Sequence, residues 1–319
     1  MQKGKGLLAA DESNNSVPKR LDPIGVESNP ENRRRFRELY LSAPGAEEYM
    51  SGVILYDETL RQKDHQGILF PKTLSARGIV PGIKVDGGTK PIPEFPEEVM
   101  TEGLDKLADR MTEYYDLGAR FAKWRSVIKI GKGIPTQECI DLNMYSLSVY
   151  ALRCQEAGIV PMVEPEVLIH GDHSIEKAEE VITNVLQTLV HFLKKYRVDF
   201  KATIVKTSMA LPGDESGHMQ DPEHIAEATS RALRNSLPNE LGGVVFLSGG
   251  QTSEQATINL NAIAKRGPYP WPVTFCYARA LQYPAIDIWK GDDANIDSAR
   301  TAFLDRLKAN AAASTGNFS

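Results

Sequence analysis

Short apolar runs alternate with longer segments of helical periodicity along the whole chain. The runs are rich in β-branched and aliphatic residues, and a polar loop follows each of them. Short, continuously apolar runs are typical of strands that are buried on both faces of a parallel sheet. We therefore predict eight strands, within residues 6–11, 52–57, 78–86, 119–128, 159–167, 200–209, 243–250 and 273–281.

The segments between these runs carry helix start signals. The pairs Asn29–Pro30 and Asp221–Pro222 each place a capping residue before a proline at the first helical position, which predicts helices over 28–42 and 221–237. Segment 174–196 has acids in its first turn and lysines in its last, as the helix dipole favours. Its apolar residues form one stripe, so this helix should pack on the strands.

Eight strands that alternate with helices, without a Pro/Ser-rich linker, favour a single α/β domain, a (β/α)₈ TIM barrel over residues 1–319. An open, doubly wound sheet is the alternative. That fold leads us to expect a glycine-rich dinucleotide loop after the first strand, and "AADESNNS" at 9–16 is not one. The barrel is therefore the preferred prediction.

The composition argues against several classes of function. The 319 residues carry a net charge of -5, and no basic run exceeds the three arginines at 33–35, which argues against nucleic-acid binding. No apolar stretch reaches the roughly 18 residues of a membrane span. The start of the sequence lacks a signal-peptide core, and three scattered cysteines fit neither a disulfide framework nor a zinc site. We expect a cytoplasmic protein, or a plastid one if a transit peptide has been removed.

Charged residues recur at the predicted strand ends, where a barrel places its mouth. Residues two apart on a strand face the same way, and three such pairs occur. Solvated strand ends would put charges on either face, whereas the repeated spacing favours one shared pocket. The pairs are Lys84/Asp86, Lys123/Arg125 and Glu164/Glu166, and Asp11, Lys206 and Arg279 stand alone.

The balance of these charges suits an anionic ligand. The basic members outnumber Asp11, Glu164 and Glu166 by two, or by one when Asp86 is counted. The sequence "SGGQ" at 248–251 precedes a helix that starts near Ser253. Its backbone amides and the Ser248 hydroxyl are placed to hold a phosphate at a helix N-terminus.

Lys206 ends a buried-looking strand. Among low-dielectric walls and beside the cation Lys123, we expect its pKa to be lowered. A neutral amine near pH 7 is a carbonyl nucleophile that forms a Schiff base. Glu164 and Asp11 are candidates for the accompanying proton transfers.

Several motifs carry a family resemblance. They are "GKGLLAADES", "SGVILYDETL", "GIKVDGG", "FAKWRSVIKI", "GIVPMVEPEVL", "FLSGGQTSEQATINLNAI" and "TFCYARALQ", in order over nearly the whole chain. The chain resembles the class I fructose-1,6-bisphosphate aldolases. The resemblance implies a metal-free TIM-barrel lyase, usually a homotetramer, that works in glycolysis and gluconeogenesis. It implies reversible cleavage of fructose 1,6-bisphosphate into dihydroxyacetone phosphate and glyceraldehyde 3-phosphate.

The resemblance also implies residue roles. Lys206 would form the Schiff base with the substrate, so no separate cofactor is expected. Asp11 would take the proton of the C4 hydroxyl, and Glu164 would move protons as the Schiff base forms and hydrolyses. Glu166 would position Glu164, and Lys123 would assist electrostatically.

The resemblance divides phosphate binding between two ends of the site. The residues implied for the phosphate nearest the ketone are Ser248, Gly249 and Arg279. Those implied for the far phosphate are Ser13, Ser16 and Lys84, with Arg20 close by, and Arg125 belongs to the same substrate-binding set.

Two alternatives stay open. Another lysine-dependent sugar-phosphate aldolase would share the barrel and the lysine, although two phosphate-binding sets argue against it. A catalytically weak aldolase-like scaffold is the other, because the family's C-terminal tail ends in a tyrosine and this sequence ends in "TGNFS". A metal site at His170, Asp172 and His173 is disfavoured, because the chain has only six histidines and no further partner for this cluster is evident.

Overall fold

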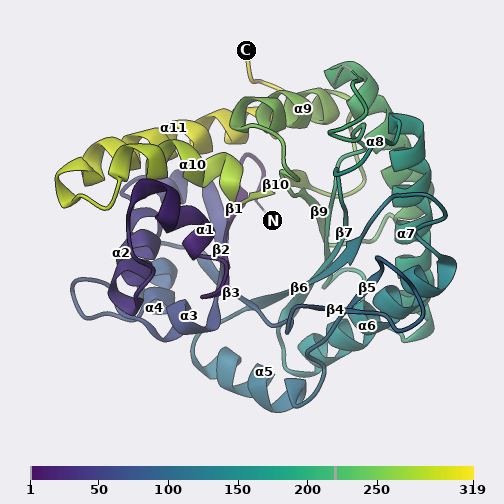
Figure 1. The fold of residues 1–319 in the computed structure, drawn as a ribbon. Helices are drawn as coiled ribbons and strands as arrows, with labels where there is room; N and C mark the ends of the chain where they lie inside the picture. Colours follow the sequence, from purple (N-terminus) through teal and green to yellow (C-terminus); the bar gives the residue numbers. More distant parts are fainter. Residues whose placement is uncertain (1, 219–220) are drawn as a thin grey trace.

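The computed structural model describes residues 2–218 and 221–319. Parallel strands close into a barrel in the order β1-β10-β9-β8-β7-β6-β3-β2, and Figure 1 shows the helices around this ring. Each of the eight predicted runs supplies one barrel strand, so the predicted TIM barrel is confirmed. The barrel strands are β1 Gly6–Ala10, β2 Met50–Leu55, β3 Val80–Lys84, β6 Phe121–Ile128, β7 Val160–Val167, β8 Ile204–Thr207, β9 Gly243–Phe246 and β10 Val273–Tyr277.

The helices form the outer layer. Asn29 caps α2 by accepting a hydrogen bond from Asn32 N at 2.9 Å, and Asp221 caps α8 by accepting one from Glu223 N. The predicted starts of these two helices are therefore confirmed. The α-helices are α1 Pro18–Leu21, α2 Pro30–Leu41, α3 Asp57–Arg61, α4 Phe70–Ala76, α5 Leu107–Asp116, α6 Gln137–Glu156, α7 Ile175–Lys195, α8 Pro222–Ser236, α9 Ser253–Lys265, α10 Arg279–Trp289 and α11 Ile296–Ala313. Short 3₁₀ turns cover Asp22–Ile24, Ala46–Glu48 and Asp293–Asn295.

Strand residues alternate between the barrel interior and the helix layer. Trp124 on β6 is fully buried against α6, with its ring 5.5 Å from that of Tyr150. Its neighbours on the strand therefore point into the barrel. Below the mouth, the interior is filled by the small apolar cluster Leu7, Ala9, Ile54, Phe121, Met162, Val245 and Cys276.

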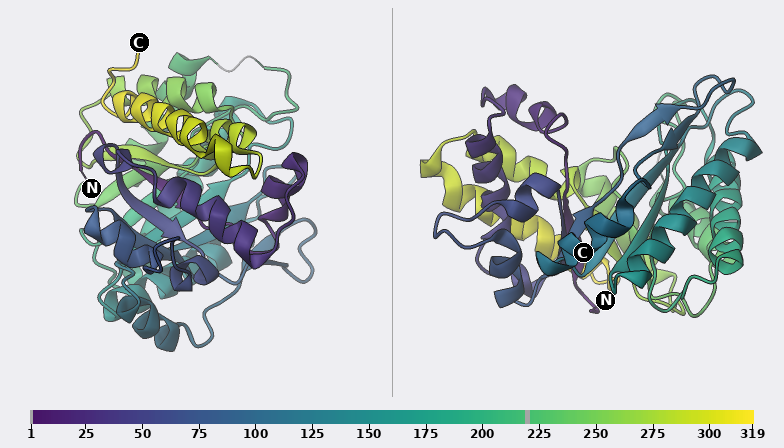
Figure 2. Two further views of the ribbon diagram at one scale, coloured as in Figure 1. Left: turned by 90° about the vertical axis from the view of Figure 1, so that its left-hand side faces the viewer. Right: turned by 90° about the horizontal axis from the view of Figure 1, so that it is seen from below.

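Helices from the two ends of the sequence lie side by side and complete the outer ring (Figures 1 and 2). Phe36 of α2 stacks on Trp289 of α10, with ring centroids 6.5 Å apart. Arg300 of α11 donates from Nε to the Leu39 carbonyl near the end of α2, at 3.3 Å. The segment that follows β1 contacts both helices, through Glu12 with Arg37 of α2 and through Arg20 with Tyr283 of α10.

Two details differ from the sequence predictions. Strands β4 (Thr89–Pro91) and β5 (Val99–Thr101) form an antiparallel hairpin outside the barrel, which no pattern indicated. Strand β10 ends at Tyr277, so Arg279 opens α10 and does not lie on the strand as predicted. The apolar run at 273–281 is continuous because the buried face of α10 follows the strand directly.

Candidate active site

Four charged side chains form a continuous row at the carboxyl ends of the strands. Lys206 Nζ on β8 lies 2.9 Å from Glu164 Oε1 on β7. The other oxygen, Glu164 Oε2, lies 2.9 Å from Lys123 Nζ on β6. Lys123 Nζ also donates to Asp11 Oδ2, directly after β1, at 2.9 Å. Charges alternate along this row, so each buried ion has an opposite charge in contact.

The row is almost closed to solvent. Only 5% of the Lys206 side chain and 3% of the Glu164 side chain are exposed. Burial lowers the pKa of Lys206, but Cys276 and Glu164 raise it by more, so it lies above the ordinary lysine value. The predicted lowering by Lys123 is therefore wrong. Lys123 does act in that direction, but it is neutralised by its own contacts with Glu164 and Asp11.

The same contacts fix the charge states of the other two groups. Burial alone would raise the pKa of Asp11, yet the charges of Lys123 and Lys206 hold it well below its ordinary value. Burial would lower the pKa of Lys123, but Asp11 and Glu164 raise it well above its ordinary value. Asp11 is therefore a carboxylate and Lys123 an ammonium at neutral pH.

The predicted same-face pairs flank this row. Arg125, the outer partner of Lys123, contacts Glu166 Oε2 at 2.9 Å, and 44% of its side chain is exposed. Lys84 Nζ contacts Asp86 Oδ1 at 2.6 Å and the Asp86 carbonyl at 2.9 Å. Lys84 does not contact Ser13 or Ser16, although its charge helps to lower the pKa of Asp11.

The loop after β1 carries three more candidates. Ser13 Oγ and Ser16 Oγ lie 3.0 Å apart. Arg20 donates from Nη1 to the Tyr283 hydroxyl on α10 at 3.1 Å, and its guanidinium lies over that ring. Because Arg279 is one helical turn before Tyr283, the structure brings Arg20 beside the helix that Arg279 opens.

The loop after β9 lies beside β8. Gly249 and Gly250 both adopt positive φ, +54° and +89°, and a Cβ on Gly249 would meet Leu247 Cδ1 at 2.9 Å. Glycine is therefore required for this turn. The buried Ser248 turns its carbonyl toward Gln251, which donates to it from the backbone N at 3.0 Å and from Nε2 at 2.9 Å.

Arg279 is less constrained than its proposed partners. It is exposed, it forms no ion pair within residues 2–218 and 221–319, and no hydrogen bond there joins it to Ser248 or Gly249. The structure therefore places Ser248 and Gly249 together and leaves the Arg279 side chain unattached near them in the fold. An unattached guanidinium is available to a phosphate.

Comparisons with known proteins decide the family. The chain matches the model described as fructose-bisphosphate aldolase class I over residues 1–319. It belongs to the class I fructose-bisphosphate aldolases. A probable class 1 aldolase of Xylella fastidiosa is 46% identical over 316 residues, which cover 99% of this chain and 95% of that protein. The cytosolic aldolase 4 of Arabidopsis thaliana is 48% identical over 99% of this chain and 80% of its own length.

A solved structure agrees with this family. It is a Plasmodium falciparum fructose-bisphosphate aldolase crystallised with TRAP and a small-molecule inhibitor. The two chains superpose with a TM-score of 0.98 at 43% identity, over 100% of this chain and 92% of that one. The resemblance read from the motifs, the TIM barrel and the lyase class are thereby confirmed.

Class I aldolases use a Schiff-base lysine and no metal. Within the described residues, no group of three or more histidine, cysteine, aspartate or glutamate side chains is arranged to hold a metal ion. In the same part of the chain, no helix has the length and apolar character needed to cross a membrane.

Sequence reasoning missed the structural roles of three residues around the site. Asp86 neutralises Lys84 and also accepts from the Arg125 backbone N at 3.3 Å. The buried Arg37 on α2 bonds the Glu12 side chain, and its Nη2 donates to the Glu12 carbonyl at 2.7 Å, which fixes the loop after β1. Gln251 holds the loop after β9. The motifs contain Asp86 and Gln251, but only the fold reveals their partners.

Proposed function

We propose that this protein cleaves fructose 1,6-bisphosphate reversibly through a Schiff base on Lys206. The observation that carries the proposal is the buried row of Lys206, Glu164, Lys123 and Asp11 at the barrel mouth. It supplies one nucleophilic amine, one carboxylate in contact with that amine and one carboxylate held ionised. These are the groups that imine formation and carbon–carbon cleavage require.

Schiff-base formation begins with a proton transfer. Because Lys206 is an ammonium in the free protein, its proton passes to Glu164, the acceptor at 2.9 Å. The neutral amine then attacks the C2 carbonyl of the open-chain ketose. A proton then moves from the attacking nitrogen to the former carbonyl oxygen, which gives the neutral carbinolamine. Glu164 returns its own proton to that hydroxyl, which leaves as water and gives the protonated imine. Lys123 stabilises Glu164 while it is ionised.

Cleavage uses the imine as an electron sink. Asp11 accepts the proton of the C4 hydroxyl, the C3–C4 electron pair moves toward the iminium nitrogen, and glyceraldehyde 3-phosphate leaves. Protonation of the resulting enamine at C3 and hydrolysis of the imine release dihydroxyacetone phosphate. The low pKa of Asp11 keeps it in the basic form at the moment when it is needed.

Binding of two phosphates orients the substrate across the barrel mouth. We assign Ser248, Gly249 and Arg279 to the phosphate nearest the ketone. We assign Ser13, Ser16, Lys84, Arg20 and Arg125 to the other end of the substrate. Gly249 and Gly250 adopt positive φ in the loop that leads to the start of α9, and backbone N–H groups at a helix start suit a phosphate.

The direct test replaces the lysine with a neutral side chain of similar length. Lys206→Met should reduce kcat for fructose 1,6-bisphosphate cleavage by at least about a thousand-fold, since nucleophile loss removes the covalent route. Lys201→Met, which changes an exposed lysine shortly before β8, should retain wild-type activity. A Lys206→Met protein that folds and turns over at the wild-type rate would contradict the proposal.

We also propose that residues 1–319 act as one catalytic domain, that the protein is a cytosolic homotetramer and that it serves gluconeogenesis as well as glycolysis. Named relatives include cytosolic aldolases, which supports the location. Exposed aromatic side chains such as Tyr115 and Tyr145 suit subunit contacts. Sedimentation equilibrium should return four times the mass of one chain, and a single-chain mass would reject the tetramer.

A further inference from the structure

Strand β7 makes few backbone contacts with β8. The N–H groups of Val160 and Leu168 donate toward β6, to Arg120 O and Ile128 O. Odd-numbered residues of β7 therefore direct their backbone groups toward β8. Two of those residues are Pro161 and Pro165, which have no N–H to donate.

The β7–β8 ladder accordingly stops early. Its paired residues are Met162 with Ile204 and Val163 with Val205, whereas the pairing of β7 with β6 continues to Val167. Glu164 and Lys206 are the next residues beyond the last pair. Their contact at 2.9 Å therefore lies where the backbone ladder no longer holds the strands together.

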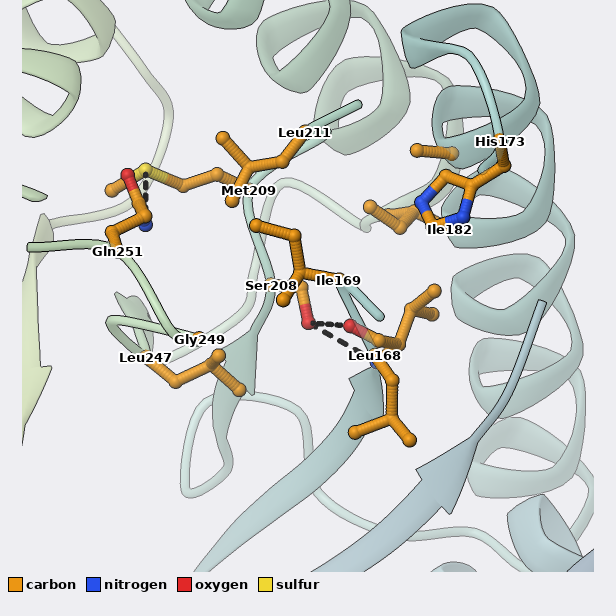
Figure 3. Close-up of a pocket in the computed structure, with 12 residues that line it drawn as sticks. Leu168, Ile169, His173, Ile182, Ser208, Met209, Leu211, Leu247, Gly249 and Gln251 are labelled. Carbon is orange, nitrogen blue, oxygen red and sulfur yellow. Dashed lines mark hydrogen bonds between the residues drawn. The ribbon is translucent and has the colours of Figure 1, made fainter. Parts of the chain in front are cut away.

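Beyond Glu164 and Lys206, the hydroxyl of one side chain joins the ends of the two strands. Ser208 Oγ donates to the Val167 carbonyl at 2.8 Å and accepts from the Val167 N–H at 3.1 Å (Figure 3). Both residues are buried. The N–H and the carbonyl of Val167, which face β8, are thus both hydrogen-bonded to the Ser208 hydroxyl.

We propose that Ser208 is a positioning residue that holds Lys206 in contact with Glu164. The paired residues of β7 and β8 precede Glu164 and Lys206, and the hydrogen bonds of Ser208 follow them. The two strands are therefore joined on both sides of the reacting side chains. Without the hydroxyl, Val167 keeps a buried N–H and a buried carbonyl without partners, and the ends of β7 and β8 are free to separate. This inference rests on the proposed function, because it assigns Ser208 to the proton transfer between Glu164 and Lys206.

The experiment compares steady-state cleavage of fructose 1,6-bisphosphate by variants at this position. Ser208→Ala should lower kcat by roughly ten- to a hundred-fold, since a misplacement of about 1 Å can cost a hundred-fold in rate. The KM should stay within about two-fold, because the assigned phosphate-binding residues lie outside β7 and β8. The rate of borohydride-trapped adduct formation in a single turnover should fall together with kcat.

A matched pair of variants, Ser208→Thr and Ser208→Val, separates the effect of the hydroxyl from the effect of side-chain shape. The small cavity in Figure 3 borders Ser208, Met209 and Leu247, and it offers room for one group of the size of a water or methyl. Ser208→Thr keeps the hydroxyl and should retain kcat, whereas Ser208→Val has the same shape without it and should behave like Ser208→Ala. The comparison of these two variants shows whether the hydroxyl is needed for kcat, even if Ser208→Ala fails to fold.

Ser126 on β6 supplies the control for loss of a buried serine. It is fully buried and its hydroxyl has no hydrogen-bond partner, so Ser126→Ala should leave kcat unchanged. Equal kcat in Ser208→Val and Ser208→Thr, or a loss that appears only in KM, would overturn the inference. A wild-type protein without cleavage activity would contradict the proposed function as well, whereas an active wild type with an equally active Ser208→Ala contradicts this inference alone.

Discussion

At the level of single residues, the central feature is the alternation of charge from Lys206 through Glu164 and Lys123 to Asp11. Buried ions are costly unless each has a partner, and removing one partner leaves the other charge uncompensated. Each member of the row is therefore stabilised by its neighbours as well as used in the chemistry. Removal of any one of these four charges should therefore affect both the stability of the fold and the activity.

Asp11 gives a pH test of this arrangement. Its pKa is lowered from the ordinary 3.8, so its ionised form stabilises the fold above that value, and this contribution is lost as the pH falls. Asp11→Asn should reduce the free energy of unfolding at pH 7. The difference from wild type should shrink by about 1 kcal/mol between pH 7 and pH 3. Urea unfolding at both pH values measures it, and a difference that does not change with pH would contradict the charge assignment.

The sequence predicted which residues share the pocket but not how they pair. Spacing of two residues on a strand predicted Lys123 and Glu164 on the inner face, and in the structure their side chains are in contact. Spacing does not reveal which charges lie closest across strands. The pKa of Lys206 was therefore predicted in the wrong direction, because Cys276 and Glu164, which raise it, outweigh burial and Lys123, which lower it.

At the level of elements, the loop between β9 and α9 is held by a buried amide. Gln251 Nε2 donates to the Ser248 carbonyl, and Asn259 Nδ2 of α9 donates to Gln251 Oε1 at 2.6 Å. Gln251 Nε2 also lies 3.7 Å from Met209 Sδ in the segment after β8 (Figure 3). The side chain thus joins the proposed phosphate loop to α9 and to the segment that follows Lys206.

Replacing this amide should weaken phosphate binding more than chemistry. Gln251→Ala removes one of the two donors to the Ser248 carbonyl and leaves the Asn259 amide without its partner, at a cost of about 1 kcal/mol or roughly five-fold in KM for fructose 1,6-bisphosphate. Inhibition by inorganic phosphate should weaken similarly, with kcat within two-fold. The exposed Gln187 provides the control variant Gln187→Ala, which should match wild type. A large fall in kcat at unchanged KM would contradict this role for the loop.

The elements that the sequence predicts well are those with a strong pattern. The eight barrel strands are buried and apolar, and α2 and α8 begin with a capping residue and a proline. The hairpin β4–β5 has no such pattern, since β4 is exposed along its length and contains Pro91. The end of β10 was misplaced because buried residues of α10 follow it without a polar break.

At the level of the whole molecule, barrel closure brings the site together. Asp11 follows β1 and Lys206 lies on β8, the sixth barrel strand in sequence order, yet both belong to the same row of charges through Glu164 and Lys123. Pairing of β1 with β10 closes the barrel, and helices from both ends of the chain lie beside it, since α2 packs against α10 and α11 (Figure 1). Sequence patterns predict the barrel, but the partners around Glu12, Asp86 and Gln251 follow only from this closure.

The central claim is that Lys206 forms the covalent bond with the substrate. The most direct measurement mixes the protein with fructose 1,6-bisphosphate, reduces with sodium borohydride, and locates the adduct by intact mass and peptide mapping, with and without a chelator. We predict one adduct per chain on Lys206, formed equally in both conditions. A folded protein that forms no adduct, or one that carries it on another lysine such as Lys123, would contradict the account.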